Sequence, residues 1–313
     1  MVEHLPDTEG VTGSNPVSRT NSLFKPRIIL NPAIHAAPPA PEELSALLRL
    51  LDDDTPAVRA RVIERLSHCG GDISEWFATQ PQTLSPIERE ILVRTLRISR
   101  RENLTRDWIV PTGGAAAIAE DWETLEALLR TLSDFLHDGI SLRQPLGDAL
   151  DLLSEEAEEA GITNAKALRK FLFDGSRLRG NKINYYDHRN SDLAWAIAEG
   201  HSNPIGLCLI FILVARRLDF EVEGVNFPGH FMCRIHEEGY PLIIDCFDNG
   251  QLHVQFTLLE SPQLTRQQRQ ILRQSADPGT ILLRILANLV QAFQEEARDE
   301  DAELIAQLQK TLA

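Results

Sequence analysis

The first half of the chain carries apolar residues at helical spacing. Leu44, Leu47, Leu48 and Leu51 recur at i, i+3, i+4 and i+7, which places them on one face of a helix. The same period predicts further helices over residues 58–66, 86–100, 122–136, 146–160 and 165–173. Residues 42–175 are therefore predicted to be all-helical, with a Pro/Gly loop at 109–114.

The first two of these helices form a hairpin around a breaker. Asp52–Pro56 interrupts the first stripe, and Gly70–Gly71 ends the second. The corner follows the pattern Asp-x-x-Pro-x-Val-Arg, which resembles one HEAT-type unit. No second copy recurs at a fixed period, so a solenoid is not expected and an ordinary helical hairpin is the alternative.

The pattern changes after Asn184. A short helix is predicted over 193–198, and Asn203–Pro204 is a strong start for a helix over 204–218, since Asn caps and Pro suits the first helical position. That helix is apolar nearly all round, which predicts burial on every side. Period-two segments then predict four short strands, at 221–226, 230–235, 241–247 and 252–256. Helices over 267–274 and 280–296, and a short acidic helix, end the chain.

These elements predict an α+β fold with a helical N-terminal half, a core of one buried helix and an antiparallel sheet, and C-terminal helices. Residues 1–40 are rich in Pro, Ser, Thr and Asn and are expected to be a disordered tail, whose start codon we suspect was assigned too far upstream. The expected divisions are a helical region over 41–115, the core with its leading helices over 116–260, and the C-terminal helices over 261–313.

Charge and composition narrow the class of protein. A formal net charge of −15 without a basic run argues against nucleic acid or an anionic membrane as a partner. No apolar run reaches the roughly 18 residues of a membrane span, and no secretory signal is expected. The four cysteines form no Cys-x-x-Cys pair, which favours reduced thiols and a cytoplasmic location.

Strand parity brings one histidine and one aspartate together. If Glu238–Gly239 is a two-residue turn, Glu237 pairs with Tyr240, and Asp245 then lies on the same face as His230. The two would be one diagonal step apart, roughly 7–8 Å between backbones. Either Asp245 orients the imidazole of a catalytic base, or the two form a structural contact that pins the hairpin.

Several short sequence motifs around this pair resemble those of the transglutaminase-like superfamily, and specifically of its bacterial SirB-one (invasion-regulator) branch. They lie at residues 185–187, 190–193, 203–207, 214–218, 228–231 and 244–247, and the helix at 284–289 resembles the one that follows the core there. The resemblance covers roughly residues 120–295. It implies a fold similar to that of papain-like thiol enzymes, in which a cysteine opens the buried helix and a histidine and an aspartate follow on successive strands.

The resemblance assigns the histidine and aspartate roles to His230 and Asp245, but an ungapped count places Pro204 where the cysteine should stand. Cys208 is the nearest thiol, one turn deeper, where the helix dipole has faded and apolar neighbours should raise its pKa. We expect Cys208 to be a core thiol, and it is the catalytic candidate only if it lies at the mouth of the helix.

The remaining reactive side chains carry weaker signals. Cys233 and Cys246 are expected to face the core, and Ser202 is a minor alternative nucleophile. No pair among His230, His236, His253 and Asp245 has a standard metal-ligand spacing, so no metal is expected, and no cofactor either; a disulfide or a zinc site is the alternative for the four cysteines.

A polar and aromatic loop precedes the core helices and supplies the candidate binding residues. We expect a cleft lined by Tyr185, Tyr186, Asp187, Asn190, Asn203 and Pro204. The alternative is an aromatic anchor, with Asn190–Ser191 capping the next helix. Two functions remain open: a non-catalytic module that binds a protein partner or a peptide-like ligand, or a peptidase, amidase or acyl transferase using Cys208, His230 and Asp245.

Overall fold

The computed structural model describes residues 38–79 and 83–313, so the tail predicted for residues 1–40 lies outside the described residues apart from 38–40. Four helices open the described part: α1 (Pro41–Leu48), α2 (Pro56–Leu66), α3 (Ser74–Thr79) and α4 (Pro86–Asp107). They enclose an apolar cluster of their own, which includes Leu44, Leu48, Val62, Leu66, Leu92 and Leu96. The likeness of α1 and α2 to a HEAT-type unit stays a prediction.

Helix α4 is longer than its predicted span of 86–100. Leu104 continues the apolar period and is 1% exposed, so burial of that side chain favours another two turns beyond the arginine-rich stretch. Ser85 and Glu88 form a reciprocal capping box at its start. The short α3 was not predicted from the sequence; the amide of Ile73, directly before it, donates to the Gly139 carbonyl oxygen in the loop after α6.

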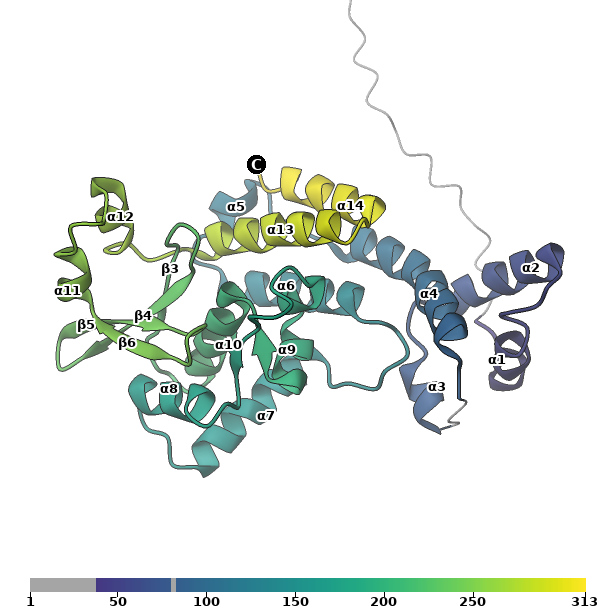
Figure 1. Cartoon of the computed structure of the whole chain (residues 1–313), viewed down its shortest axis with the longest axis horizontal. Helices are drawn as coiled ribbons and strands as arrows, with labels where there is room; N and C mark the ends of the chain where they lie inside the picture. The colour runs from purple at the N-terminus through teal and green to yellow at the C-terminus, as the bar shows by residue number, and fades with distance from the viewer. Residues whose placement is uncertain (1–37, 80–82) are drawn as a thin grey trace, which may run out of the picture. The chain divides into compact units, whose positions relative to one another are not determined.

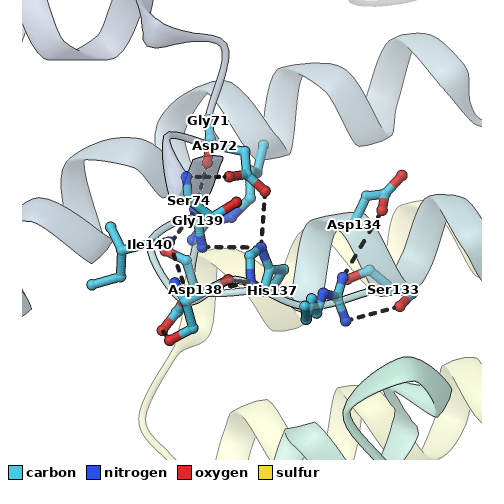
Figure 2. A network of polar contacts seen from close by, with 12 residues as sticks. Gly71, Asp72, Ser74, Ser133, Asp134, His137, Asp138, Gly139 and Ile140 are labelled. Carbon is cyan, nitrogen blue, oxygen red and sulfur yellow. Dashed lines mark hydrogen bonds and ion pairs between the residues drawn. The ribbon is translucent and has the colours of Figure 1, made fainter. Parts of the chain in front are cut away.

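A polar network centred on His137 ties the segment before α3 to the loop after α6 (Figure 2). His137 Nδ1 lies 3.0 Å from Asp72 Oδ2, and Nε2 lies 2.8 Å from the carbonyl oxygen of Ser141. The Gly139 amide also lies 3.3 Å from Nδ1, so both ring nitrogens are engaged. The buried Arg100 adds donations to the carbonyl oxygens of Gly71 and Asp138.

The following helices build the floor of the core. They are α5 (Gly114–Ala117), α6 (Trp122–Leu136), α7 (Leu146–Glu159), α8 (Ala165–Phe173) and α9 (Leu193–Glu199), with a short parallel pair between β1 (Arg179–Gly180) and β2 (His201–Ser202). The bounds of α6 and α8 agree with the prediction, whereas α5 occupies a segment next to the predicted loop. Asp192 caps α9, so the predicted Asn190–Ser191 cap is wrong.

Helix α10 (Pro204–Arg217) is the central buried element, as its apolar sequence predicts. Asn203 caps it by accepting from the Gly206 amide at 2.8 Å, and Pro204 opens it. Gly206 permits a close approach, since a Cβ there would lie 2.8 Å from the carbonyl oxygen of Asn190. The start of α10 is therefore fixed by both its cap and its neighbours.

A four-stranded antiparallel sheet covers α10, in the order β3 (Glu223–Val225), β4 (Met232–Glu237), β5 (Tyr240–Asp245) and β6 (Gln251–Val254) (Figure 1). Glu237 pairs with Tyr240, as the turn predicts, and Glu238 and Gly239 both have positive φ, which suits a two-residue hairpin turn. The predicted last strand over 252–256 ends early, because α11 (Gln255–Leu259) begins there. The α+β class is confirmed.

The C-terminal helices are α12 (Arg266–Ile271), α13 (Pro278–Glu295) and α14 (Asp299–Lys310). Helices α13 and α14 run side by side (Figure 1), and the apolar face of α13 joins the same large core as α10. Within the described part of the chain, no helix combines the length and the apolar character needed to cross a membrane.

Candidate functional site at the start of α10

His230 and Asp245 meet at one edge of the sheet, in the register that the hairpin turn predicts. The imidazole Nε2 lies 2.8 Å from Asp245 Oδ1, and the two side chains are 31% and 18% exposed. His230 ends a tight turn in which its amide donates to the carbonyl oxygen of Phe227. The turn and the strand register together place a histidine and a carboxylate in ion-pair contact.

The surroundings of Asp245 favour its ionised form. Burial acts to raise the pKa of Asp245, but His230 and the backbone amides of Phe247 and Asp248 outweigh it, and the pKa falls below its usual value. The contact with Asp245 in turn raises the pKa of His230, against the effect of burial. The pair therefore favours an imidazolium held by a carboxylate.

The second ring nitrogen of His230 is uncommitted. Across residues 38–79 and 83–313, no hydrogen bond engages Nδ1 of His230, whereas its Nε2 lies in ion-pair contact with Asp245, although not in hydrogen-bond geometry. The Phe247 ring packs edge-on against the imidazole, with 6.1 Å between ring centroids. An imidazole held at one nitrogen and open at the other has the arrangement of a general base.

Cys208 does not meet this base. It lies in the second turn of α10, is 0% exposed, and its Sγ lies 3.5 Å from the carbonyl oxygen of Phe231, to which it donates. No hydrogen bond joins Cys208 to His230 in the part of the chain that the structure describes. Ser202 is also 0% exposed, and its hydroxyl donates to the Asn190 carbonyl oxygen at 2.5 Å.

Cys208 instead belongs to a cluster with Cys233 and Cys246, which we call the thiol cluster. Burial acts to raise the pKa of Cys208, but hydrogen bonding within the cluster with Cys233 and Cys246 outweighs it and lowers that pKa. Burial, and next to it hydrogen bonding with Cys208, raise the pKa of Cys233 and of Cys246 well above the usual value. The three sulfurs thus influence one another's pKa while lying out of reach of solvent.

A pocket of about 390 Å³ opens at the start of α10. It is lined by five of the predicted cleft residues, namely Tyr185, Tyr186, Asp187, Asn203 and Pro204. Gly229, next to His230, also lines it. Asn190 does not line it: that side chain is fully buried and donates to the carbonyl oxygens of Asn184 and Tyr185, so it holds the loop from beneath.

The other wall of the pocket comes from α13, through Arg284, Asn288 and Gln291. These side chains were missed as site residues, although their spacing of i, i+4 and i+7 puts them on one helix face. Arg284 donates to Asn226 Oδ1 and to the Phe227 carbonyl oxygen. Among the described residues, no ion pair engages Arg284, and the pocket lining also includes the carboxylate residue Asp187, which pairs with Arg189.

Comparison with known proteins gives this arrangement a family. The family model described as the transglutaminase-like superfamily matches residues 140–287, which include α10, His230 and Asp245. A UPF0162 protein of Xylella fastidiosa (strain 9a5c) is 32% identical over 205 residues, covering 59% of this chain and 70% of that protein. This chain belongs to the UPF0162 family.

Two further relatives match this chain over a smaller share of their own length. A UPF0162 protein from Xylella fastidiosa strain Temecula1 is 34% identical over 159 residues, covering 46% of this chain and 54%, about half, of that protein. The F-box only protein 21 of Homo sapiens is 28% identical over 148 residues, covering 44% of this chain and 23% of that protein. No solved structure matches the chain significantly.

Proposed function

We propose that this protein is a non-catalytic binding module that takes a peptide-like segment of a protein partner in the pocket at the start of α10. The observation that carries the proposal is Pro204 at the first position of that helix, where the family resemblance places the nucleophile. Proline has no nucleophilic atom, and the nearest thiol, Cys208, is 0% exposed. The pocket is therefore present, whereas the position expected to carry the nucleophile holds the unreactive Pro204.

The chemistry of the walls supports a peptide as the ligand. The side-chain amides of Asn203, Asn288 and Gln291 offer donors and acceptors that match a peptide backbone. Tyr185 and Tyr186 are 40% and 49% exposed and stack edge to face, which gives an aromatic surface for an apolar side chain. Arg284 supplies a cation for a carboxylate of the ligand.

Two finer assignments accompany this proposal. The sequence motifs at 203–207 and 228–231 support the SirB-one (invasion-regulator) branch within the superfamily. The free cysteines support a cytoplasmic location. A cytoplasmic regulatory module would meet its partner there as a folded protein or as an extended segment.

The test is a panning of a displayed peptide library on the purified full chain. We expect enriched peptides with an acidic residue, and at least about a tenfold loss of affinity in Arg284→Gln, the effect of one charge-assisted contact. Arg94→Gln is the matched control, because Arg94 is an exposed arginine on α4 that does not line this pocket. Equal loss in both variants, or no enriched peptide, would contradict the proposal.

A second candidate function follows from the free Nδ1 of His230. A working thiol enzyme would use Cys208 as nucleophile, His230 as base and Asp245 as orienter, after a movement that brings the thiol to the imidazole. Site-resolved labelling of native protein between pH 5 and 9 decides between the two. Rapid labelling of Cys208 at neutral pH that is lost in His230→Ala supports the enzyme, and labelling only after unfolding supports the binding module.

A further inference from the structure

Three thiols that lie far apart in the sequence meet in the interior of the core. Cys208 comes from α10, Cys233 from β4, and Cys246 directly follows β5. Their Sγ atoms all lie within 4.8 Å of one another, and the sulfurs of Cys233 and Cys246 are 3.9 Å apart. All three residues are 0% exposed. Separations of 25 residues between Cys208 and Cys233 and 13 between Cys233 and Cys246 conceal this cluster in the sequence.

The spacing of the sulfurs fits a single metal ion. A zinc–thiolate bond is about 2.3 Å long, so two sulfurs on one tetrahedral ion lie about 3.8 Å apart. The observed 3.9 Å between Cys233 and Cys246 needs no rearrangement of those two side chains. The donor set is sulfur alone, without a carboxylate, which selects soft cations over magnesium, calcium or manganese.

We propose that Cys208, Cys233 and Cys246 form a binding site for one soft, thiophilic cation, Zn²⁺ or Cu⁺. Binding displaces the thiol protons, and the three thiolates then bridge the buried helix to both strands of the β4–β5 hairpin. A three-sulfur set serves Cu⁺ directly, whereas a tetrahedral Zn²⁺ takes one more donor. The carbonyl oxygen of Phe231, 3.5 Å from the Cys208 sulfur, is the nearest oxygen that contacts the thiol cluster.

The metal site would be a structural staple beneath the pocket. It would hold α10 against the hairpin that carries His230 and Asp245, and so fix the relative position of the two sides of the candidate site. The proposal does not depend on any peptide binding in the pocket, since the sulfurs are buried and line no part of it.

Cadmium provides the probe, because cadmium–thiolate bonds absorb in the near ultraviolet and cadmium takes the same ligands as zinc. The full chain, purified under reducing conditions, is titrated with Cd²⁺. We expect a charge-transfer band that saturates at one equivalent. The affinity should fall at least about tenfold in each of Cys208→Ser, Cys233→Ser and Cys246→Ser. Cys69→Ser is the matched control, because Cys69 packs in the separate N-terminal cluster.

A second measurement uses the unaltered protein and so does not require any variant to fold. X-ray absorption of the chain loaded with one equivalent of Zn²⁺ should show three sulfur neighbours at about 2.3 Å. A shell of only nitrogen and oxygen, or a titration without a cadmium–thiolate band, would mean a packed thiol cluster and overturn the proposal. An equal loss of affinity in Cys69→Ser would overturn it as well.

Discussion

Two histidine–aspartate pairs among the described residues, His137 with Asp72 and His230 with Asp245, differ in how much of the imidazole is committed. His137 uses both nitrogens, one on Asp72 and one on the Ser141 carbonyl oxygen, and its side chain is only 7% exposed. His230 uses Nε2 alone, on Asp245, and is 31% exposed beside a pocket. A saturated, buried ring fixes two segments together, whereas a half-committed ring can still act on a ligand. The comparison separates a pair whose ring nitrogens are both engaged from one that keeps Nδ1 open beside a pocket.

The largest effect is expected from removing the saturated ring. His137→Ala deletes two ring contacts and leaves the Ser141 carbonyl oxygen and Asp72 without them, so the free energy of unfolding should fall by about 2–3 kcal/mol. Urea denaturation of wild type and variant measures this. A loss below about 0.5 kcal/mol would show that the network in Figure 2 does not hold the two segments together.

The next effect concerns the free nitrogen of His230. In a Cys69→Ser background, Pro204→Cys places a thiol at the first position of α10, where the helix N-terminus and an imidazolium lower a thiol pKa. We expect iodoacetamide to label it at neutral pH about tenfold faster than the thiol of Asn288→Cys, which lies in the same pocket on α13. Tenfold corresponds to about 1.4 kcal/mol.

The contrast between these two thiols depends on His230. Adding His230→Ala should return Pro204→Cys to the slower rate and leave Asn288→Cys unchanged. If the two thiols react equally, or if removing the imidazole changes neither rate, His230 is not presented to the mouth of α10. The half-committed ring would then have no functional meaning.

The sequence predicts most of the fold because the decisive signals are local. The Asn203–Pro204 start, the apolar helix after it and the Glu238–Gly239 turn together determine the register that brings Asp245 to His230. The thiol cluster could not be predicted in this way, since its members lie on α10, on β4 and just after β5, and only the packing of α10 on the hairpin unites them. The α13 wall of the pocket was missed for the same reason, although its one-face spacing is visible in the sequence.

A smaller effect, dependent on pH, is expected at Asp72. Burial acts to raise the pKa of Asp72, but hydrogen bonds from His137 and Ser74 outweigh it and hold that pKa well below its usual value. In the unfolded chain the carboxyl titrates near its ordinary value of about 3.9. Its contribution to stability is therefore complete above that pH and is lost as the pH falls toward the folded-state pKa.

Urea midpoints of wild type and Asp72→Asn between pH 7 and pH 3 measure this contribution. The difference between the two proteins should shrink as the pH falls below about 4, because the unfolded chain then gains a proton that the folded chain resists. Asp54→Asn, at an exposed position before α2, is the control and should give a small and constant difference. A constant difference in Asp72→Asn would mean that this carboxyl is not stabilised by folding.

The smallest effect on stability is expected from His230→Ala, although this residue is the one placed beside the pocket. Asp245 keeps the backbone amides of Phe247 and Asp248 as donors when the imidazole is removed, so its charge is not left without partners. The ring is also partly exposed, and a partly solvated ion pair contributes under about 1 kcal/mol. Urea denaturation should therefore give a midpoint close to that of wild type. A loss as large as that of His137→Ala would show that His230 pins the hairpin as His137 pins its loop, and the distinction between the two pairs would fail.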